Sequence, residues 1–429
     1  ISDIKVSGAN ASPDARLREL LEKLDLRLDG KGKLGLGSDN LLFIACELLL
    51  LAQESEGSKM LLIEEPEAHL HAQRQLKVMR FMQEHAEAKG IQIIVTTHSP
   101  NLASAIKLKN LVMIRKPRAF SLAESQTLLE PSDYQFLKRF LDVTKANLFF
   151  ARGVVIVEGD AENILLPTLA NLLKRDFAEH GVSVINVGGV GLRRYARIFQ
   201  RKDTEKDGQI NVPVACVTDM DVMPNCAPLI MGKIKEGEWP EKSTRRWKAK
   251  KDFGTADELA KYRTEKDAKA SGQYVKSFVS DEWTLEYDLA LGPKASNGVF
   301  SGGLAEEVFA AVCLAEVDES INAKKKTVEG VKIIAAGEFI EAKNSAVTKD
   351  DCTIEEVLAS TIYAKLVRSG VSKAIVSQYL ADLLQSKYGK DEYAAAELRQ
   401  RLPTYLTNAI DYVTRASEAE PEHQKSADG

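Results

Sequence analysis

The segment Val154-Val-Ile-Val-Glu-Gly-Asp-Ala-Glu162 decides the fold that we expect for this chain. Four consecutive β-branched residues predict a buried strand, and Gly159 allows a sharp turn directly after Glu158. The helix that begins there carries a second acid, Glu162, in its first turn. Parallel α/β sheets bind ligands at such strand-to-helix crossovers. The segment therefore predicts a parallel sheet with carboxylates at its carboxyl edge.

A second acidic strand end follows about sixty residues later, in Val214-Ala-Cys-Val-Thr-Asp-Met-Asp221. If the strand continues through this segment, alternation directs Asp219 and Asp221 to the same face. Four carboxylates from two neighbouring strand ends repel one another unless cations lie between them. Hard oxygen donors select Mg²⁺, Mn²⁺ or Ca²⁺ rather than zinc or copper. The two segments together predict a divalent-cation site.

The periodicity around these segments predicts a doubly wound α/β domain. Strands are expected at 154–157, 182–187, 212–218 and 275–279, with helices at 161–175, at 191–200 and after Trp283. Residues 222–275 are charged and aperiodic, which indicates an insertion. From about residue 302 the pattern is mainly helical, most clearly at 353–366 and 371–386. We expect residues 417–429 to be a disordered tail.

The first 118 residues show a different set of motifs. Strands are expected at 60–63, 91–95 and 111–114, and helices at 14–28, 40–52 and 67–88. The first strand ends in Glu64 and Glu65, where one carboxylate can hold a magnesium-bound water and the other can polarise an attacking water. The second ends in Thr-Thr-His98-Ser-Pro, and Ser38 closes a glycine-rich turn before a helix. Any one of these alone is better explained as a charge pair or a helix cap.

In this order the motifs resemble the C-terminal half of an ABC-type ATPase of the SMC-like and OLD-like branch. The resemblance covers residues 1–118 and gives Glu64 and Glu65 the Walker B positions, His98 the switch position and Ser38 a signature-like position. No G-x-x-x-x-G-K-[ST] phosphate loop is present. We therefore expect no ATP turnover by this chain alone, and we interpret it as a C-terminal fragment.

Composition limits the remaining possibilities. The 429 residues carry a net charge of −4, so no global positive field indicates a nucleic-acid partner. The five cysteines are scattered and form no C-x-x-C pair, which favours a reducing compartment over disulfides or a zinc site. The most apolar stretch, residues 41–52, is too short to span a bilayer, and no leader opens the chain. We expect a cytoplasmic protein without a membrane partner.

The pattern E-G-x-x-E followed by D-x-D resembles the Toprim fold of topoisomerases, primases and nucleases. Together with the ATPase half it resembles the OLD (overcoming lysogenization defect) family, and residues 371–384 resemble its class 2 subgroup, which is encoded beside a helicase. The implied layout is an ATPase half (1–118), a connector (119–150), a Toprim domain (151–301), a helical part that completes it (302–416) and the tail. The resemblance implies a DNA endonuclease with two divalent cations. It also implies ATP binding and dimerisation through the ATPase heads in the full-length protein, with a helicase as a possible partner.

The resemblance also completes the site. Glu286, in Trp283-Thr-Leu-Glu-Tyr-Asp-Leu289, is preferred over Glu282 as a further metal ligand, and Lys373 is preferred over Lys343 as the catalytic lysine. The lysine would neutralise charge on the scissile phosphate or protonate the leaving oxygen. The expected ligands of the first metal are Glu158, Asp219 and Asp221, and those of the second are Glu162 and Glu286.

DNA contacts are expected in the insertion. Residues 242–251 (KSTRRWKAKK) are strongly basic, and Arg245, Arg246, Trp247 and Lys248 form its centre. A solvated charged loop is an equally good interpretation. Two other function classes stay open besides the nuclease: a DNA or nucleotide clamp without chemistry of its own, and a Toprim topoisomerase or primase.

Overall fold

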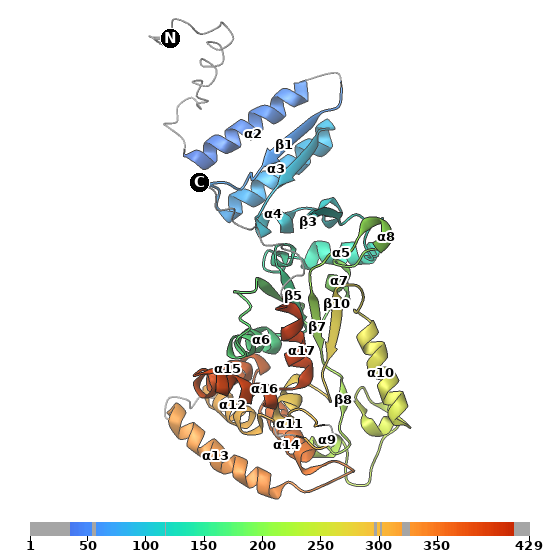
Figure 1. Cartoon of the computed structure of the whole chain (residues 1–429), viewed down its shortest axis with the longest axis vertical. Coiled ribbons are helices and arrows are strands. Elements are labelled where there is room, and N and C mark those ends of the chain that lie inside the picture. The colour runs from blue at the N-terminus through green and yellow to red at the C-terminus, as the bar shows by residue number, and fades with distance from the viewer. Residues whose placement is uncertain are drawn as a thin grey trace, which may run out of the picture. The chain divides into compact units, whose positions relative to one another are not determined.

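The computed structural model describes residues 35–53, 57–115, 117–295, 298–300, 303–319 and 327–415. The chain divides into two compact units, residues 1–106 and 107–429 (Figure 1). Each unit is described by itself below. The helix expected at 14–28, most of the glycine-rich turn and the tail at 417–429 lie outside the described residues.

The smaller unit is built on two parallel strands. It contains α2 (Leu36–Gln53), β1 (Met60–Glu64), α3 (Ala72–Lys89), β2 (Gln92–Thr96) and α4 (Pro100–Ala105). Glu64 at the end of β1 is in register with Thr96 at the end of β2, so both loops leave the same edge. Ile44, Leu48 and Met82 are among the apolar side chains that form the core. The strands expected at 60–63 and 91–95 and the helices expected at 40–52 and 67–88 are confirmed.

Helix α2 begins at Leu36, four residues earlier than the periodicity indicated. Among the described helices it is long and apolar enough to cross a membrane by length and composition, with a mean hydropathy of 1.4. The expected apolar stretch at 41–52 alone is too short for this. Ile44 and Leu48 of α2 are buried in the core of the smaller unit, whereas Leu49 and Leu50 are exposed.

The larger unit opens with a segment that we expected to be a strand of the ATPase half and then a polar connector. Strand β3 (Val112–Arg115) instead pairs antiparallel with β4 (Arg118–Ser121) in the larger unit. Along the chain, β4 is followed by α5 (Pro131–Phe140) and the 3₁₀ turn η2 (Lys145–Phe149), while η1 (Leu108–Asn110) precedes β3. Leu122 and Leu137 are fully buried. Because its apolar side chains are packed, this segment is ordered structure rather than a linker.

A four-stranded parallel sheet forms the centre of the larger unit. Its order is β10 (Val275–Val279), β7 (Val214–Thr218), β5 (Gly153–Val157) and β6 (Val182–Asn186), which confirms the expected fold class. Every residue of β5 and β7 is buried, as expected for parallel strands covered on both faces. The helices that pack against its strands include α6 (Asp160–Leu172), α7 (Leu192–Arg197) and α17 (Thr404–Val413), and α11 (Leu285–Leu291) follows β10. All four strands therefore end at one edge, where the acidic segments lie.

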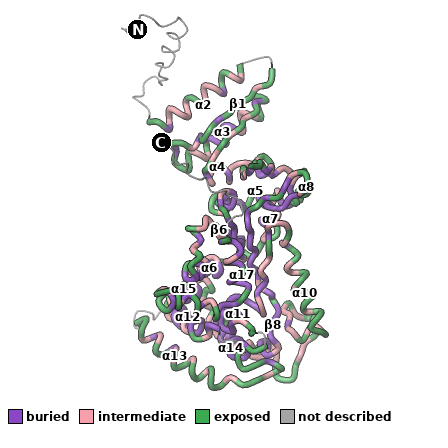
Figure 2. Tube along the Cα trace, viewed as in Figure 1, coloured by how far each residue is buried: buried purple, intermediate pink, exposed green. Residues whose placement is uncertain are grey.

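The insertion and the helical part surround this edge. The insertion contains β8 (Val222–Met223), α9 (Ala227–Ile230), η3 (Lys242–Thr244), β9 (Lys248–Ala249), η4 (Lys250–Asp252) and α10 (Ala256–Ala268), and the short helix α8 (Thr204–Asp207) precedes β7. The helical part contains α12 (Ala305–Asp318), α13 (Val328–Ser345), α14 (Ile354–Ser369), α15 (Lys373–Tyr388) and α16 (Glu392–Arg401). Figure 2 shows buried residues along the sheet and the helices against it, whereas α10 and α13 are mostly exposed.

Candidate active site at the carboxyl edge of the sheet

Glu158 lies directly after β5, beside the end of the neighbouring strand β7. Thr218, the last residue of β7, donates its hydroxyl to Oε1 of Glu158 at 2.5 Å. A Cβ at Gly159 would lie only 3.2 Å from Oε2 of Glu162, so glycine leaves room for this carboxylate to approach the turn. The E-G-x-x-E segment thus places both glutamates at one strand end, as the spacing predicts.

Glu162 is buried in the first turn of α6. Burial raises the pKa of its carboxyl, and the charges of Glu286 and Glu158 raise it further, while Lys373 opposes them. These three charged side chains come from other elements, and they must lie near Glu162 to affect its pKa. Glu162 therefore belongs to one electrostatic cluster with Glu158, Glu286 and Lys373.

Asp219 follows β7 directly and faces the same cluster. Its Oδ1 accepts the backbone N–H of Leu285 at 3.1 Å, at the start of α11. Burial raises the pKa of Asp219 well above its ordinary value, and Glu286 and Glu162 add to the rise against the opposing charge of Lys373. Carboxylates this close resist ionising together unless positive charge compensates them. Asp219 is thus a further, half-buried acid at the carboxyl edge.

Glu286 and Lys373 complete the cluster. Nζ of Lys373, the first residue of α15, lies 3.0 Å from Oε2 of the buried Glu286 and 5.3 Å from the centre of the Tyr363 ring. Partial burial disfavours the charge of Lys373, but the charges of Glu286, Tyr363 and Asp219 outweigh it and raise the pKa of the amine. The ammonium group therefore stays protonated across the neutral range.

The alternative residues lie elsewhere. Glu282 forms an ion pair with Lys250 at 2.5 Å rather than with Lys373. Lys343 is exposed on α13, and within the described residues no hydrogen bond or ion pair joins it to the acids of the cluster. The geometry thus brings Glu286 and Lys373 to the carboxyl edge in preference to Glu282 and Lys343.

The argument that placed Asp221 on the same face as Asp219 was wrong. Strand β7 ends at Thr218, and the backbone of Asp221 is left-handed, with φ of 60°, so strand alternation does not apply. The side chain of Asp221 is exposed and forms an ion pair with Lys266 of α10 at 2.5 Å. Its charge still raises the pKa of Asp219 slightly. Asp221 therefore lies at the rim of the cluster rather than inside it.

The chemistry of the cluster fits hard divalent cations, because every donor is a carboxylate oxygen and two of the acids are buried beside like charges. Within the described residues, however, no three His, Cys, Asp or Glu side chains are close enough together to hold a metal ion. Lys373 and Lys266 supply the positive charge beside Glu286 and Asp221. These side chains match the donor type that magnesium or manganese requires, but they are not arranged as a finished metal cage.

In the smaller unit, the loops after β1 and β2 meet. His98 Nε2 lies 3.7 Å from Glu65 Oε1, and both side chains are largely exposed, so the pair itself contributes little to stability. Glu67 accepts hydrogen bonds from the Thr97 hydroxyl and from the His98 backbone, at 2.6 and 2.9 Å. Glu67 orients the loop that carries His98, and the sequence analysis missed this role.

Ser38 lies in the first turn of α2, where Nη1 of Arg74 donates to its hydroxyl at 3.3 Å. A Cβ at Gly37 would overlap the backbone carbonyl of His69, so the glycine allows the helix start to approach the loop after β1. The start of α2 therefore adjoins the segment that follows Glu64. Among the expected ATPase residues, Glu65 and His98 meet, while Ser38 contacts Arg74.

Much of the basic loop makes contacts within the protein, and its contact with DNA stays a prediction. The side chain of Arg245 is only 5% exposed, forms an ion pair with Asp252, and lies 3.8 Å from the centre of the half-buried Trp247 ring. Lys248 lies 4.2 Å from the ring centre of Tyr262. Of the four expected DNA contacts, only Arg246 is exposed. The interleaved tryptophan and arginine form a structural stack, a pattern that sequence cannot distinguish from a binding surface.

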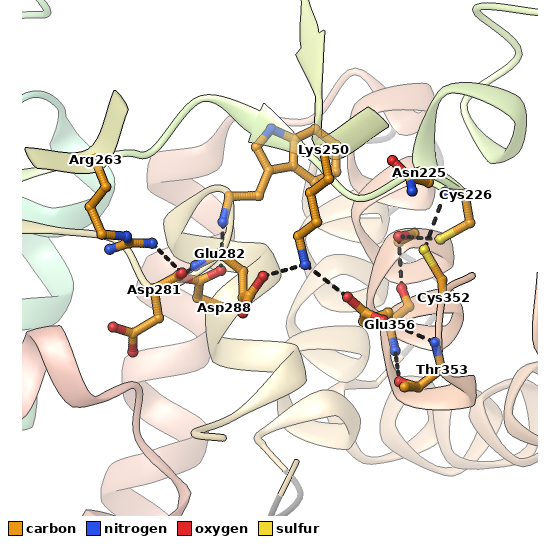
Figure 3. Close-up of polar contacts among 12 residues, drawn as sticks. Asn225, Cys226, Lys250, Arg263, Asp281, Glu282, Asp288, Cys352, Thr353 and Glu356 are labelled. Carbon is orange, nitrogen blue, oxygen red and sulfur yellow. Dashed lines mark hydrogen bonds and ion pairs between the residues drawn. The ribbon is translucent and has the colours of Figure 1, made fainter. Parts of the chain in front are cut away.

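Three residues of the site were missed by sequence reasoning. Thr218 holds Glu158, Lys266 holds Asp221, and Lys250 joins Glu282 to Glu356 (Figure 3). Thr218 directly precedes the D-x-D segment, so its position was a usable signal. The two lysines lie in the aperiodic insertion, and nothing in their local sequence indicates their partners.

Two family models match the chain. Residues 149–221 match the overcoming lysogenization defect protein-like TOPRIM domain, and residues 7–103 match an AAA ATPase domain. The chain is similar to the OLD nuclease of Thermus scotoductus, with 29% identity over 224 residues, which is 50% of this chain and 40% of that protein. It is also similar to endonuclease GajA of Bacillus cereus strain HuB5-5, with 24% identity over 223 residues, 45% of this chain and 31% of that protein.

Solved structures of OLD C-terminal regions also resemble the chain. That of Xanthomonas campestris pv. campestris is 22% identical, with a TM-score of 0.32, and the match covers 62% of this chain and 94% of that one. That of Burkholderia pseudomallei is 20% identical, with a TM-score of 0.30, and the match covers 62% and 98%. The chain spans less than half the length of the two curated relatives. An OLD-like TOPRIM domain is thus preceded by an AAA ATPase segment in this chain, and its relatives include proteins named OLD nuclease.

Proposed function

We propose that this chain is the DNA-cleaving part of an OLD-family endonuclease that depends on divalent metal. The observation that carries the proposal is the electrostatic cluster of Glu158, Glu162, Asp219, Glu286 and Lys373 at the carboxyl edge of the sheet. The similarity to proteins named OLD nuclease and endonuclease GajA supports it. The substrate would be duplex DNA, cut at a phosphodiester bond.

The acids would hold two cations, Mg²⁺ or Mn²⁺, with Ca²⁺ as a third candidate. Bound there, such ions activate water and stabilise the departing 3′ oxygen. Glu158, fixed by Thr218, and Asp219 would serve mainly one ion, with Asp221 joining once its pair with Lys266 opens. Glu162 and Glu286 would serve the other.

Lys373 would act by charge rather than by proton transfer. Its pKa is raised by Glu286, Tyr363 and Asp219 against the effect of burial, so the ammonium group keeps its proton. A fixed positive charge near the scissile phosphate stabilises the negative charge that builds up there during in-line attack. Of the two roles considered for this lysine, its environment favours charge stabilisation.

The test is nicking of supercoiled plasmid with Mg²⁺ or Mn²⁺ and without ATP, by the wild type, Glu158→Gln and Glu179→Gln. Glu179 is an exposed acid just before the amino end of β6, at the opposite edge of the sheet from Glu158, so its variant should cut normally. Metal-dependent nicking that Glu158→Gln abolishes supports the nuclease. DNA binding without nicking would support a clamp, and a covalent protein–DNA adduct would support a topoisomerase.

The remaining expectations concern the longer protein. We propose that it binds ATP and dimerises through its ATPase heads, that this chain alone does not turn over ATP, and that a helicase is a possible partner. Glu65 and His98, which lie 3.7 Å apart, would adjoin the nucleotide in such a dimer, with Ser38 and Glu64. We place the protein in the cytoplasm.

A further inference from the structure

A polar pocket of about 290 Å³ lies in the larger unit, and no step of the proposed reaction uses it. It is lined by Arg118, Ala119, Gln126, Arg201, Lys206 and Asp207. Strand β4 supplies Arg118, the segment after α7 supplies Arg201, and α8 supplies the last two residues. Three cations against one acid leave the lining with an excess of positive charge.

The pocket is separate from the carboxylate cluster. Helix α7 leads from the carboxyl end of β6 towards the amino end of β7, so Arg201 lies at the opposite edge of the sheet. Strands of five residues span roughly 16 Å. In Figure 1, α8 lies beside α5 at one end of the larger unit, whereas α6, α11 and α15 lie towards the other. A ligand in this pocket would therefore not touch the catalytic acids.

Arg201 gives the pocket a buried, incompletely compensated charge. Its side chain is only 1% exposed, and its nearest acid, Asp207, lies 3.9 Å away. The guanidinium donates to the Ser121 carbonyl and the Gln126 side chain, at 2.5 and 3.2 Å, while its Nε has no hydrogen-bond partner among the residues that the structure describes. Burial lowers the pKa of Arg201, and Asp207 only partly opposes this. A buried cation of this kind is stabilised when an anion approaches it.

Arg118 and Lys206 add two exposed cations at the mouth. Neither side chain forms an ion pair or a hydrogen bond with an acid in the part of the chain that the structure describes. The guanidinium of Arg118 lies over Gly208, whose φ is 71°, and a Cβ at that position would overlap Nη1 of Arg118. The glycine thus leaves room for the arginine to reach the pocket.

We propose that this pocket binds a phosphate group, either from a nucleic-acid backbone or from a free nucleotide or pyrophosphate. Arginine presents a planar set of donors that matches phosphate oxygens, and lysine adds a mobile charge. The volume is at the lower limit for ligand pockets, which suits a phosphate or diphosphate rather than a large organic ligand. Asp207 remains paired with Arg201 and leaves two positive charges for the anion.

The test measures binding in EDTA, so that it does not depend on cleavage and its failure is distinct from failure of the proposed nuclease. Pyrophosphate is titrated by calorimetry, and a fluorescein-labelled 20-mer duplex is titrated by anisotropy over a range of KCl concentrations. The variants are Arg118→Glu and Lys206→Glu, with Lys390→Glu as the control because Lys390 is exposed on another part of the unit. Melting curves check that all of them fold.

Loss of pyrophosphate binding in both pocket variants, with normal DNA binding, identifies a free anion as the ligand. Weaker DNA binding, with the salt slope reduced by about 1 for each residue, identifies a backbone phosphate. Gly208→Ala keeps every charge but displaces Arg118, so it should lower the affinity for the same ligand. If both charge variants bind both ligands as Lys390→Glu does, the pocket takes no phosphate and the proposal fails.

Discussion

Lys250 provides the most direct test of how the insertion is fixed to the catalytic sheet. Its Nζ lies 2.5 Å from Glu282, which follows β10, and 3.0 Å from Glu356 in the first turn of α14 (Figure 3). Both acids are largely buried. Burial disfavours the charge of Lys250, but Glu282 and then Glu356 outweigh it and raise the pKa of the amine. We predict that Lys250→Met strongly destabilises the larger unit.

The expected loss of stability follows from the two carboxylates that Lys250→Met leaves without a partner. Removing one partner of a buried ion pair costs about 3–5 kcal/mol, because the remaining charge is uncompensated. Glu356 still accepts the backbone N–H of Thr353 at 2.9 Å, so we expect the lower end, about 3 kcal/mol. In the wild type the raised pKa of Lys250 gives a contribution that is complete below pH 10 and is lost only as pH rises through the folded-state pKa. The wild-type contribution of this pair is therefore constant between pH 5.5 and 8.

In the variant, the pH dependence of the folding free energy has the opposite sign. The two carboxylates are left largely buried without a compensating charge, and protons bound at lower pH neutralise part of this charge and restore stability. The loss of stability caused by Lys250→Met should therefore be larger at pH 8 than at pH 5.5. Urea unfolding followed by tryptophan fluorescence at both pH values measures it, and adding Glu282→Gln should restore part of the stability.

Lys251→Met is the matched control, since Lys251 is exposed and lies 5.0 Å from the centre of the Trp239 ring, without an acid partner in the described residues. An unfolding midpoint for Lys250→Met equal to that of this control at pH 8 would show that the two acids do not need the lysine. A loss that does not depend on pH would show that packing, rather than uncompensated charge, is responsible.

Three further predictions concern the site and the basic loop. Lys373→Met should lower the turnover number for plasmid nicking by about 10²–10³-fold at saturating Mn²⁺; unchanged turnover would remove this lysine from the reaction. Because burial, then Glu286, raises the pKa of Asp219, protons should compete with metal, and the Mn²⁺ concentration for half-maximal nicking should rise as pH falls from 8 to 6; a constant value would contradict this. Arg245→Ala should lower the melting temperature without changing the salt dependence of DNA binding. Arg246→Ala should change the salt dependence and leave the melting temperature unchanged. A changed salt dependence in Arg245→Ala at an unchanged melting temperature would show that Arg245 contacts DNA.

The sheet could be predicted from sequence because its signals are local. Runs such as Val154–Val157 are buried on both faces, so periodicity and composition alone identify them. The E-G-x-x-E spacing also fixed the positions of Glu158 and Glu162, since strand end, turn and helix start are consecutive. The side-chain direction of Asp221 could not be predicted in this way. Alternation holds only while a strand continues, and β7 ends three residues earlier, at Thr218.

The insertion could not be predicted, because its order depends on distant partners. Lys250 contacts Glu356, which is 106 residues away, and Lys373 contacts Glu286, which is 87 residues away. A choice between Lys373 and Lys343 likewise requires knowing which helix begins at the carboxyl edge. The strands of the insertion have only two residues each, so it lacks periodicity, and its basic loop looks like solvated charge or a binding surface.

The insertion is best understood as part of the frame of the site. Lys250 anchors it to Glu282 beyond the end of β10, and Lys266 anchors it to Asp221 beyond the end of β7. These are the ends of adjacent strands, so the insertion contacts the carboxyl edge at two neighbouring points. Lys250 is held between two buried acids, whereas the partner of Lys266 is exposed, so the second anchor opens at lower cost. Turning of the Lys266 side chain would therefore release Asp221, whereas α10 itself is also held to the end of β10 by Arg263, which donates to the Val279 and Asp281 carbonyls.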